Sequence, residues 1–191
     1  MKCSPWQIWW ANVHDVAEFI ILSAGEESDM THLKLQKMLY FAQGTHLART
    51  GTPLFEDAIQ TWKLGPVVET IYQRYKVCGK NPIYAEGLTD SAVEQSFTEE
   101  EANTIIDVIL EYGKYSASYL IDLTHAPGTP WDQTDLNTQI SNNLIHQYFQ
   151  GKDAAPAVKI DCSAIPTIGK RKNGVLVLPA SDEDWSEFDE V

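Results

Sequence analysis

The five histidines and three cysteines of this chain are the residues best suited to binding a metal ion. A metal-binding helix places a second ligand three or four residues after the first, and after His14 these positions hold Ala17 and Glu18. Glu18 alone makes a weak second ligand. His32 and His46 fall on one expected helix but about 21 Å apart along its axis, so they cannot share an ion. The spacing therefore predicts no metal site.

Catalytic patterns are also missing from the sequence. It contains no G-x-S-x-G serine motif, no P-loop and no dinucleotide-binding glycine pattern. Glu99, Glu100 and Glu101 look like paired carboxylates, but they follow Thr98 at an expected helix start, where acidic side chains stabilise the helix dipole. We therefore expect no catalytic residue and no cofactor, and hence a protein that is not an enzyme.

Helices must position most of the chain, because apolar residues recur at helical spacing along it. Thr31 and Thr98 are predicted N-caps, Gly51 is a predicted helix stop, and Pro66 suits the first turn of a helix. Helices are expected at about residues 9–24, 31–49, 66–79, 98–113 and 116–123, and in a last segment that ends before Gly151. Residues 59–63 are expected to be extended.

These elements predict a mainly α fold with two regions. Residues 1–151 are expected to form a compact multi-helix domain with one or two short β-strands. Residues 152–191 are expected to form a C-terminal extension with a linker, a β-hairpin and an acidic tail. The hairpin signal is Asn173-Gly174, with strands expected at residues 167–168 and 175–178. A lone hairpin is marginally stable in water, so its strands need a sheet edge of the body or of a partner.

The net charge of −13 is concentrated in the predicted domain, where nine basic and nineteen acidic residues leave −10 before residue 152. Such a body repels a phosphate backbone, so we expect no direct binding of nucleic acid. It suits a basic protein partner, although solubility alone also explains a high charge. In the tail, six acidic residues surround Trp185 and Phe188, which is typical of an interaction segment or of a solvated end.

Several features indicate a cytoplasmic protein. The cysteines are widely spaced and form no C-x-x-C pair, so neither a disulfide framework nor a zinc site is indicated. The longest apolar run, residues 19–22, is far too short to span a membrane, and the N-terminus lacks the pattern of a signal peptide. Trp6, Trp9 and Trp10 suit either packing on the first helix or an interface with a partner or within a homo-oligomer.

Several sequence blocks closely resemble the Panacea domain, a helical module of many bacterial and phage antitoxins. The blocks are LKLQKMLYFAQ at residues 33–43, GTPLF at 51–55 and WKLGPVV at 62–68, followed by Tyr72, Tyr75-Lys76, LTH at 123–125 and Pro130-Trp131. They occur in the order and spacing of the family, and the resemblance covers about residues 13–150. It leaves the last forty or so residues outside.

The resemblance implies an antitoxin that binds a protein toxin encoded beside it and blocks the toxin's active surface. The charge of the chain suggests that this toxin is basic. Two alternatives remain open. Some relatives look like adaptors that deliver the toxin to a AAA+ protease, and a phage-associated regulator is a further alternative.

Candidate partner-binding residues come from these blocks and from the extension. In the blocks they are long polar and aromatic residues, the types in which interfaces are enriched: Lys37, Tyr40, Gln43, Trp62, Lys63, Tyr75 and Lys76. Lys37, Tyr40 and Gln43 lie off the apolar stripe of their helix and are expected at the rim of the bundle. For Trp62 and Tyr72 a role in the core is favoured. In the extension the candidates are Val175, Val177, Trp185 and Phe188.

Overall fold

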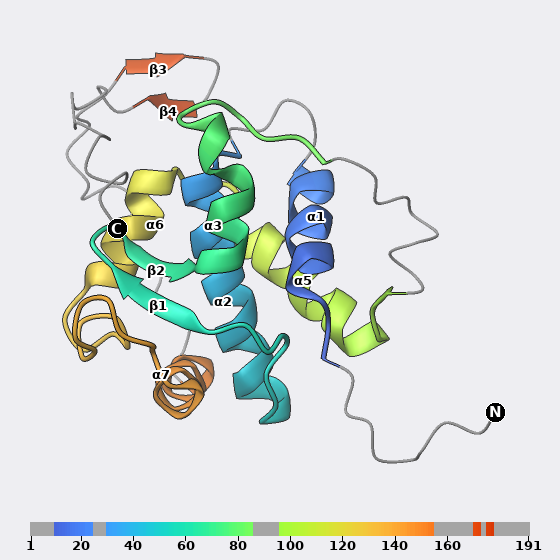
Figure 1. Ribbon diagram of the computed structural model, residues 1–191, viewed down its shortest axis with the longest axis vertical. Helices are drawn as coiled ribbons and strands as arrows, with labels where there is room; N and C mark the ends of the chain where they lie inside the picture. Colours follow the sequence, from blue (N-terminus) through green and yellow to red (C-terminus); the bar gives the residue numbers. More distant parts are fainter. Residues whose placement is uncertain (1–9, 25–29, 86–95, 155–169, 173–174, 178–191) are drawn as a thin grey trace. The chain divides into compact units, whose positions relative to one another are not determined.

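The computed structural model describes residues 10–24, 30–85, 96–154, 170–172 and 175–177. The chain divides into two compact units, residues 1–156 and 157–191. The described part of the first unit contains six α-helices, one 3-10 helix and a two-stranded sheet (Figure 1). They are α1 (Val13–Ala24), α2 (His32–Thr50), β1 (Ile59–Trp62), β2 (Gly65–Val68), α3 (Glu69–Tyr75), η1 (Lys76–Cys78), α5 (Glu99–Tyr112), α6 (Ala117–His125) and α7 (Asn142–Ala154). The predicted mainly α fold is confirmed.

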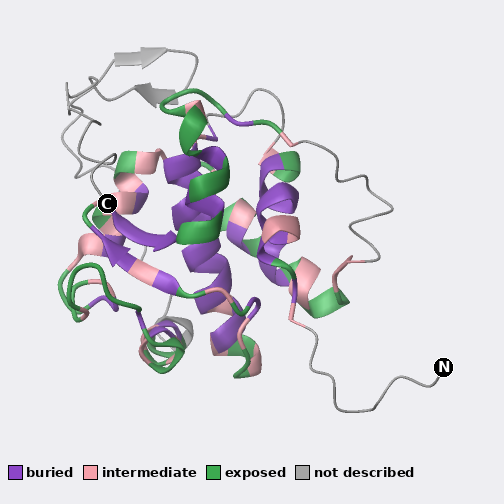
Figure 2. Ribbon diagram, viewed as in Figure 1, coloured by how far each residue is buried: buried purple, intermediate pink, exposed green. Residues whose placement is uncertain are grey.

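Helix α2 is the centre of the first unit. It packs against α1, α3, α5, α6, α7 and β2, and Figure 2 shows it buried along most of its length. Its ends are set locally, as predicted. The Thr31 side chain accepts a hydrogen bond from the backbone N–H of Lys34, and Gly51 ends the helix in the left-handed conformation at φ 73°.

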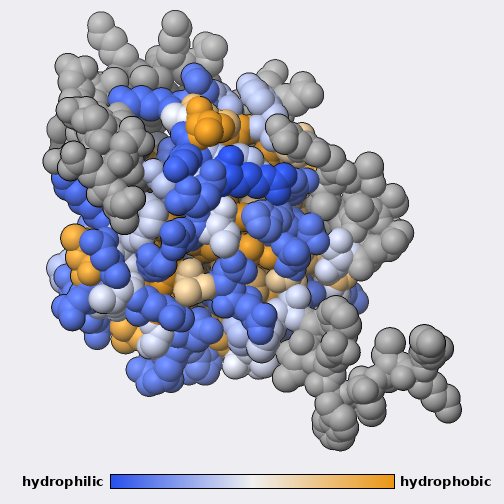
Figure 3. All heavy atoms as spheres, in the orientation of Figure 1, coloured by the Kyte–Doolittle hydropathy of each residue, from blue (hydrophilic) through white to orange (hydrophobic). Residues whose placement is uncertain are grey.

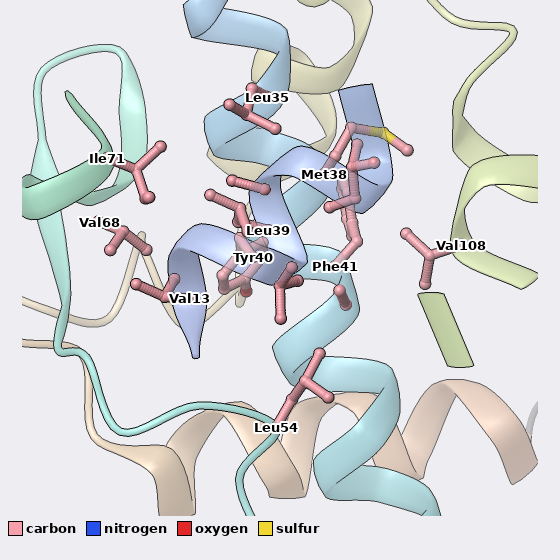
Figure 4. Close-up of a cluster of buried hydrophobic side chains, with 14 of the residues drawn as sticks. Val13, Leu35, Met38, Leu39, Tyr40, Phe41, Leu54, Val68, Ile71 and Val108 are labelled. Carbon is pink, nitrogen blue, oxygen red and sulfur yellow. The ribbon is translucent and has the colours of Figure 1, made fainter. Parts of the chain in front are cut away.

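The hydrophobic core lies around α2 and draws on every neighbouring element. Figure 4 shows α2 side chains such as Leu39 and Phe41 among residues of the surrounding elements, including Val13, Val68 and Val108. Helix α7 comes closest at Gly44, where an added Cβ would overlap the ring of Phe149. Because α2 has neighbours on all sides, its polar residues also become buried.

The chain between α2 and α3 forms a β-hairpin, where the sequence predicted that a helix already begins at Pro66. Strands β1 and β2 are antiparallel, with Ile59 opposite Val68 and Trp62 opposite Gly65. The prediction of a helix from Pro66 is therefore wrong, because Pro66 lies in β2 and α3 begins only at Glu69. A proline is tolerated in an edge strand, where its missing N–H removes no ladder hydrogen bond.

Other element boundaries follow their local signals closely. Thr98 and Glu101 form the predicted capping box of α5, and the Ser116 side chain caps α6. Helix α7 continues through Gly151 to Ala154, four residues beyond its predicted end before Gly151. A glycine inside a helix lowers helix stability by only about 1 kcal/mol relative to alanine. A glycine therefore indicates a helix end reliably only where it adopts the left-handed conformation.

The second unit contributes one described feature, the antiparallel pair of β3 (Lys170–Lys172) and β4 (Val175–Val177). The predicted first strand at residues 167–168 lies outside the described residues. Lys170–Lys172, which was expected to belong to the turn, instead forms β3. The predicted acidic tail also lies outside the described residues, and the boundary after residue 151 stays a prediction. Among the helices that the structure describes, none combines the length and the apolar character needed to cross a bilayer.

Candidate partner-binding surface

The tip of the β1–β2 hairpin, residues 62–66, is held by three side chains from distant parts of the chain. Lys37 Nζ donates a hydrogen bond to the carbonyl oxygen of Pro66 at 3.0 Å. Trp131 Nε1 donates to the carbonyl oxygen of Trp62 at 2.8 Å. His125 Nε2 lies 3.1 Å from the carbonyl oxygen of Lys63. Three carbonyl groups of the tip are thus anchored to α2, to α6 and to the loop after α6.

Gly65 allows the tip to approach this close. Its φ of +104° is a conformation that residues with a side chain rarely adopt. A Cβ at this position would lie 2.8 Å from Nζ of Lys37 and 2.9 Å from Oγ1 of Thr124. Residue 65 must therefore be glycine both for its backbone conformation and for the space that its neighbours occupy.

The ring of His125 contacts Trp131, α6 and the hairpin tip. Its centroid lies 3.7 Å from that of Trp131, and Nδ1 lies 2.8 Å from the carbonyl oxygen of Ile121. With Nε2 facing Lys63, both ring nitrogens face carbonyl oxygens, which only accept hydrogen bonds. A neutral ring donates to one of these carbonyls, and the doubly protonated ring donates to both. His125 therefore ties α6 to the hairpin tip.

The amine of Lys37 is unusual because its side chain is completely buried. Burial lowers the pKa of Lys37 to about 7, since the charged form loses its hydration. Burial, with the nearby Lys37 as the smaller cause, also lowers the pKa of His32. Near neutral pH the Lys37 amine is thus partly uncharged, and it still donates a hydrogen bond to Pro66.

The prediction that Lys37, Tyr40 and Gln43 reach the rim of the bundle is wrong. Their exposed fractions are 0%, 1% and 0%, so none of them reaches the surface of the described unit. The reason is the enclosure of α2: Lys37 faces β2, Gln43 faces the loop after α2, and the Tyr40 ring packs against Phe149 of α7. These residues hold other segments in place.

The buried glutamines of α2 show how this is done. Gln43 Oε1 accepts hydrogen bonds from the backbone N–H groups of Leu54 and Phe55, and its Nε2 donates to the carbonyl oxygen of Phe55. Gln36 makes the same two-sided pairing with the backbone N–H and carbonyl of Val68. Each amide thus pairs with backbone groups in the way that a neighbouring strand would. Through them α2 positions the segment before β1 and the end of β2.

Lys63 and Lys76 are the predicted contact residues of the first unit that are exposed. Trp62 and Tyr72 pack edge to face with centroids 4.9 Å apart, and Lys76 Nζ lies 6.0 Å from the Tyr72 centroid. We call Trp62, Lys63, Tyr72 and Lys76 the hairpin surface. The favoured core role of its two aromatic residues is confirmed, since both are buried. Figure 3 shows a mainly hydrophilic face over α3.

The remaining candidates divide between the core and the extension. Tyr75, the last residue of α3, is buried and packs into the hydrophobic core. Val175 and Val177 lie in β4, while Trp185 and Phe188 lie outside the described residues. No three His, Cys, Asp or Glu side chains come together as a metal site in the described part of the chain.

Sequence reasoning missed the two anchoring residues His125 and Trp131, and also Thr124, which lies close to Gly65. Their only signal was membership in the LTH and Pro-Trp blocks. Nothing in their local pattern indicates that they contact residues 62–65, because these segments are about 60 positions apart in the chain.

Comparisons with known proteins agree with this arrangement of blocks. A family model described as antitoxin SocA-like, Panacea domain, matches residues 35–132. The chain is 32% identical over 117 residues to antitoxin SocA of Caulobacter vibrioides (strain NA1000 / CB15N), covering 58% of this chain and 62% of that relative. It thus spans less than two thirds of the relative's length, and no solved structure matches it significantly. The family match includes α2 from Leu35 onward, the hairpin and all three anchors, and the chain therefore belongs to the Panacea domain family of SocA-like antitoxins.

Proposed function

We propose that this protein is an antitoxin that neutralises a cognate protein toxin in the cytoplasm by binding it directly, without catalysis of its own. Family membership and the similarity to an antitoxin support the role. The observation that carries the binding mode is the hairpin tip, whose three carbonyl groups are anchored by Lys37, His125 and Trp131. The matched blocks build this anchor, and the exposed Lys63 sits on it.

A rigid tip favours binding because little conformational entropy is lost when the partner docks. Lys63 is exposed beside Trp62 at the tip, and Lys76 lies over the ring of Tyr72, so both lysines offer cationic contacts. The buried pair of Trp62 and Tyr72 supports these lysines from below. We propose that the hairpin surface contacts the toxin.

The C-terminal extension is the second proposed contact. An exposed strand can join the edge of a partner's sheet, and acidic-aromatic segments fold on contact with basic surfaces. Val175 and Val177 in β4 would contribute to such a strand, and Trp185 and Phe188 would serve as aromatic anchors. The net charge of −13 makes a basic toxin the proposed partner.

Co-expression with the protein encoded next to this chain's gene tests the proposal. Growth rescue together with a complex that survives size-exclusion chromatography is the expected result. A harmless neighbour, or one that this protein neither protects against nor binds, would contradict the antitoxin role. Gln36→Leu with Gln43→Leu is the negative control, because it removes the buried amides that hold the hairpin region and should therefore lose growth rescue.

Purified components separate direct neutralisation from delivery to a AAA+ protease. Inhibition of the toxin by this protein alone is expected for a direct blocker. An adaptor would leave the toxin active until protease and ATP are added, and its protection would disappear in cells without the protease.

A further inference from the structure

The outer face of α5 carries two exposed aliphatic side chains that the fold does not require. Ile106 is 41% exposed and Leu110 is 71% exposed. They are four residues apart, so they lie one above the other on the same side of the helix. The inner side of α5 is already occupied by the buried Ile105 and Val108, which pack into the core.

Exposed acidic side chains lie on the same helix as this aliphatic pair, most of them along one flank of it. Glu99, Glu100, Asp107 and Glu111 are exposed on α5, and Asp107 pairs with Arg49 of α2 at 2.8 Å. Lys114 just beyond the helix is the nearest basic residue along the chain. We call Ile106, Leu110 and these four carboxylates the α5 face. It combines an apolar strip with a negative rim.

The acidic residues of the α5 face indicate which kind of partner can bind there. Two copies that met through the α5 face would bring eight carboxylates together around a small apolar contact, and like charges at an interface cost affinity. A positively charged partner gains from the same rim. An amphipathic helix with aliphatic residues one turn apart fits a hydrophobic groove, which is the helix-in-groove form of recognition.

We propose that the α5 face is a second contact surface for the cognate toxin, and that the toxin presents an apolar groove with a basic rim. The inference rests on the proposed antitoxin function and names the chemistry of its partner. Figure 1 shows α5 and the β1–β2 hairpin on different sides of α2, so substitutions in the two surfaces test separate contacts.

The test uses the full chain with Ile106→Gln and Leu110→Gln, because glutamine retains helix propensity and both positions are exposed. Leu136→Gln is the matched control, since Leu136 is 55% exposed and lies outside α5. Affinity for the purified neighbour-encoded protein is measured by calorimetry at low and high salt. We expect the double variant to bind at least about tenfold more weakly than the control, which corresponds to about 1.4 kcal/mol.

A variant with two neutralised carboxylates tests the acidic part of the α5 face separately. Glu100→Gln with Glu111→Gln should slow association and reduce its salt dependence, because fewer carboxylates steer the basic partner. If the double variant at residues 106 and 110 and the charge variant both bind the toxin with wild-type affinity, the α5 contact is overturned. The antitoxin role would remain intact.

Other outcomes are equally decisive. If the wild-type chain neither binds nor neutralises its neighbour, the antitoxin function itself fails. If the double variant loses much thermal stability, Ile106 and Leu110 serve the fold and the inference is wrong. If wild-type protein alone is a dimer and the double variant a monomer, the occupant is a second copy instead of a basic toxin.

Discussion

Lys37 reaches from the middle of α2 to the β1–β2 hairpin, where its Nζ donates a hydrogen bond to the carbonyl oxygen of Pro66 at 3.0 Å. A family block on the central helix is thereby connected to a family block at the hairpin tip. The bond lies in the interior, where an unsatisfied carbonyl or an uncompensated ammonium group destabilises the fold.

The buried Lys37 should make stability depend on pH above neutrality. Its folded-state pKa is about 7, against about 10.4 in the unfolded chain, so between these values the unfolded state binds more protons. The free energy of unfolding should therefore rise with pH from about 7 to 9.5, by on the order of 1 kcal/mol per pH unit. Urea unfolding across this range measures it.

Lys37→Met is the control for this pH dependence, because methionine has similar length and no charge. The rise between pH 7 and 9.5 should disappear in the variant. Relative to wild type the variant should therefore lose stability steadily as the pH rises from 7 to 9.5, because only the wild-type protein gains stability over this range. Burial raises the pKa of Tyr40, so above pH 10 the folded state keeps a proton that the unfolded state loses. Tyr40 therefore lowers the free energy of unfolding as the pH rises above 10. An equal slope in both proteins would contradict the assignment.

Gln43→Leu should destabilise the protein by about 3 kcal/mol or more. The substitution keeps the apolar volume but leaves the N–H groups of Leu54 and Phe55 and the carbonyl of Phe55 without their partner. Thermal and urea unfolding measure the loss. Gln73→Leu is the control at an exposed position, where a change within about 0.5 kcal/mol is expected. A similar small change for Gln43 would show that water replaces its hydrogen bonds.

Gly65→Ala should destabilise the hairpin tip through both strain and collision. The new methyl group would press on Lys37 and Thr124, and alanine disfavours φ +104°. We expect a loss of about 2–4 kcal/mol. Gly128→Ala isolates the strain, because Gly128 has φ +81° and nothing within 4 Å of an added Cβ. Equal losses at the two sites would remove the packing argument for Gly65.

Charge reversal on the hairpin surface should weaken neutralisation without unfolding the protein. We expect Lys63→Glu with Lys76→Glu to reduce toxin affinity by about tenfold or more, because the two exposed lysines would meet local acidic groups of the toxin, while the toxin's basic groups face the acidic parts of this chain. Lys80→Glu reverses one charge in the loop after η1, and we expect it to reduce affinity less than either single reversal, Lys63→Glu or Lys76→Glu. Unchanged affinity in the double variant, with normal thermal stability, would move the interface away from this surface.

Removal of residues 157–191 should leave the first unit folded, because the deletion begins after α7 and outside that unit. We expect neutralisation of the toxin to fall by about tenfold or more, through the loss of strand addition and aromatic contacts. Circular dichroism checks the fold, and growth rescue checks the function. Full protection by the truncated chain would place the entire interface on the helical unit.

Local signals were sufficient to predict much of the fold. Thr31, Gly51 and Thr98 were recognised as helix ends because each acts through hydrogen bonds or backbone conformation within a few residues. The strand at residues 59–62 was also visible. Pro66 misled the prediction, since a proline suits a first helical turn and an edge strand alike, and only pairing with Thr61 decides between them.

Burial of the polar residues on α2 was decided by tertiary structure alone. Sequence periodicity places Lys37, Tyr40 and Gln43 off the apolar stripe, and for a helix with one covered side that position is exposed. Helix α2 is instead covered on all sides, so its amide and amine groups turn to backbone partners far along the chain. The caps depend on neighbours in sequence, whereas this burial depends on which elements surround α2, and that is settled only when the whole unit packs.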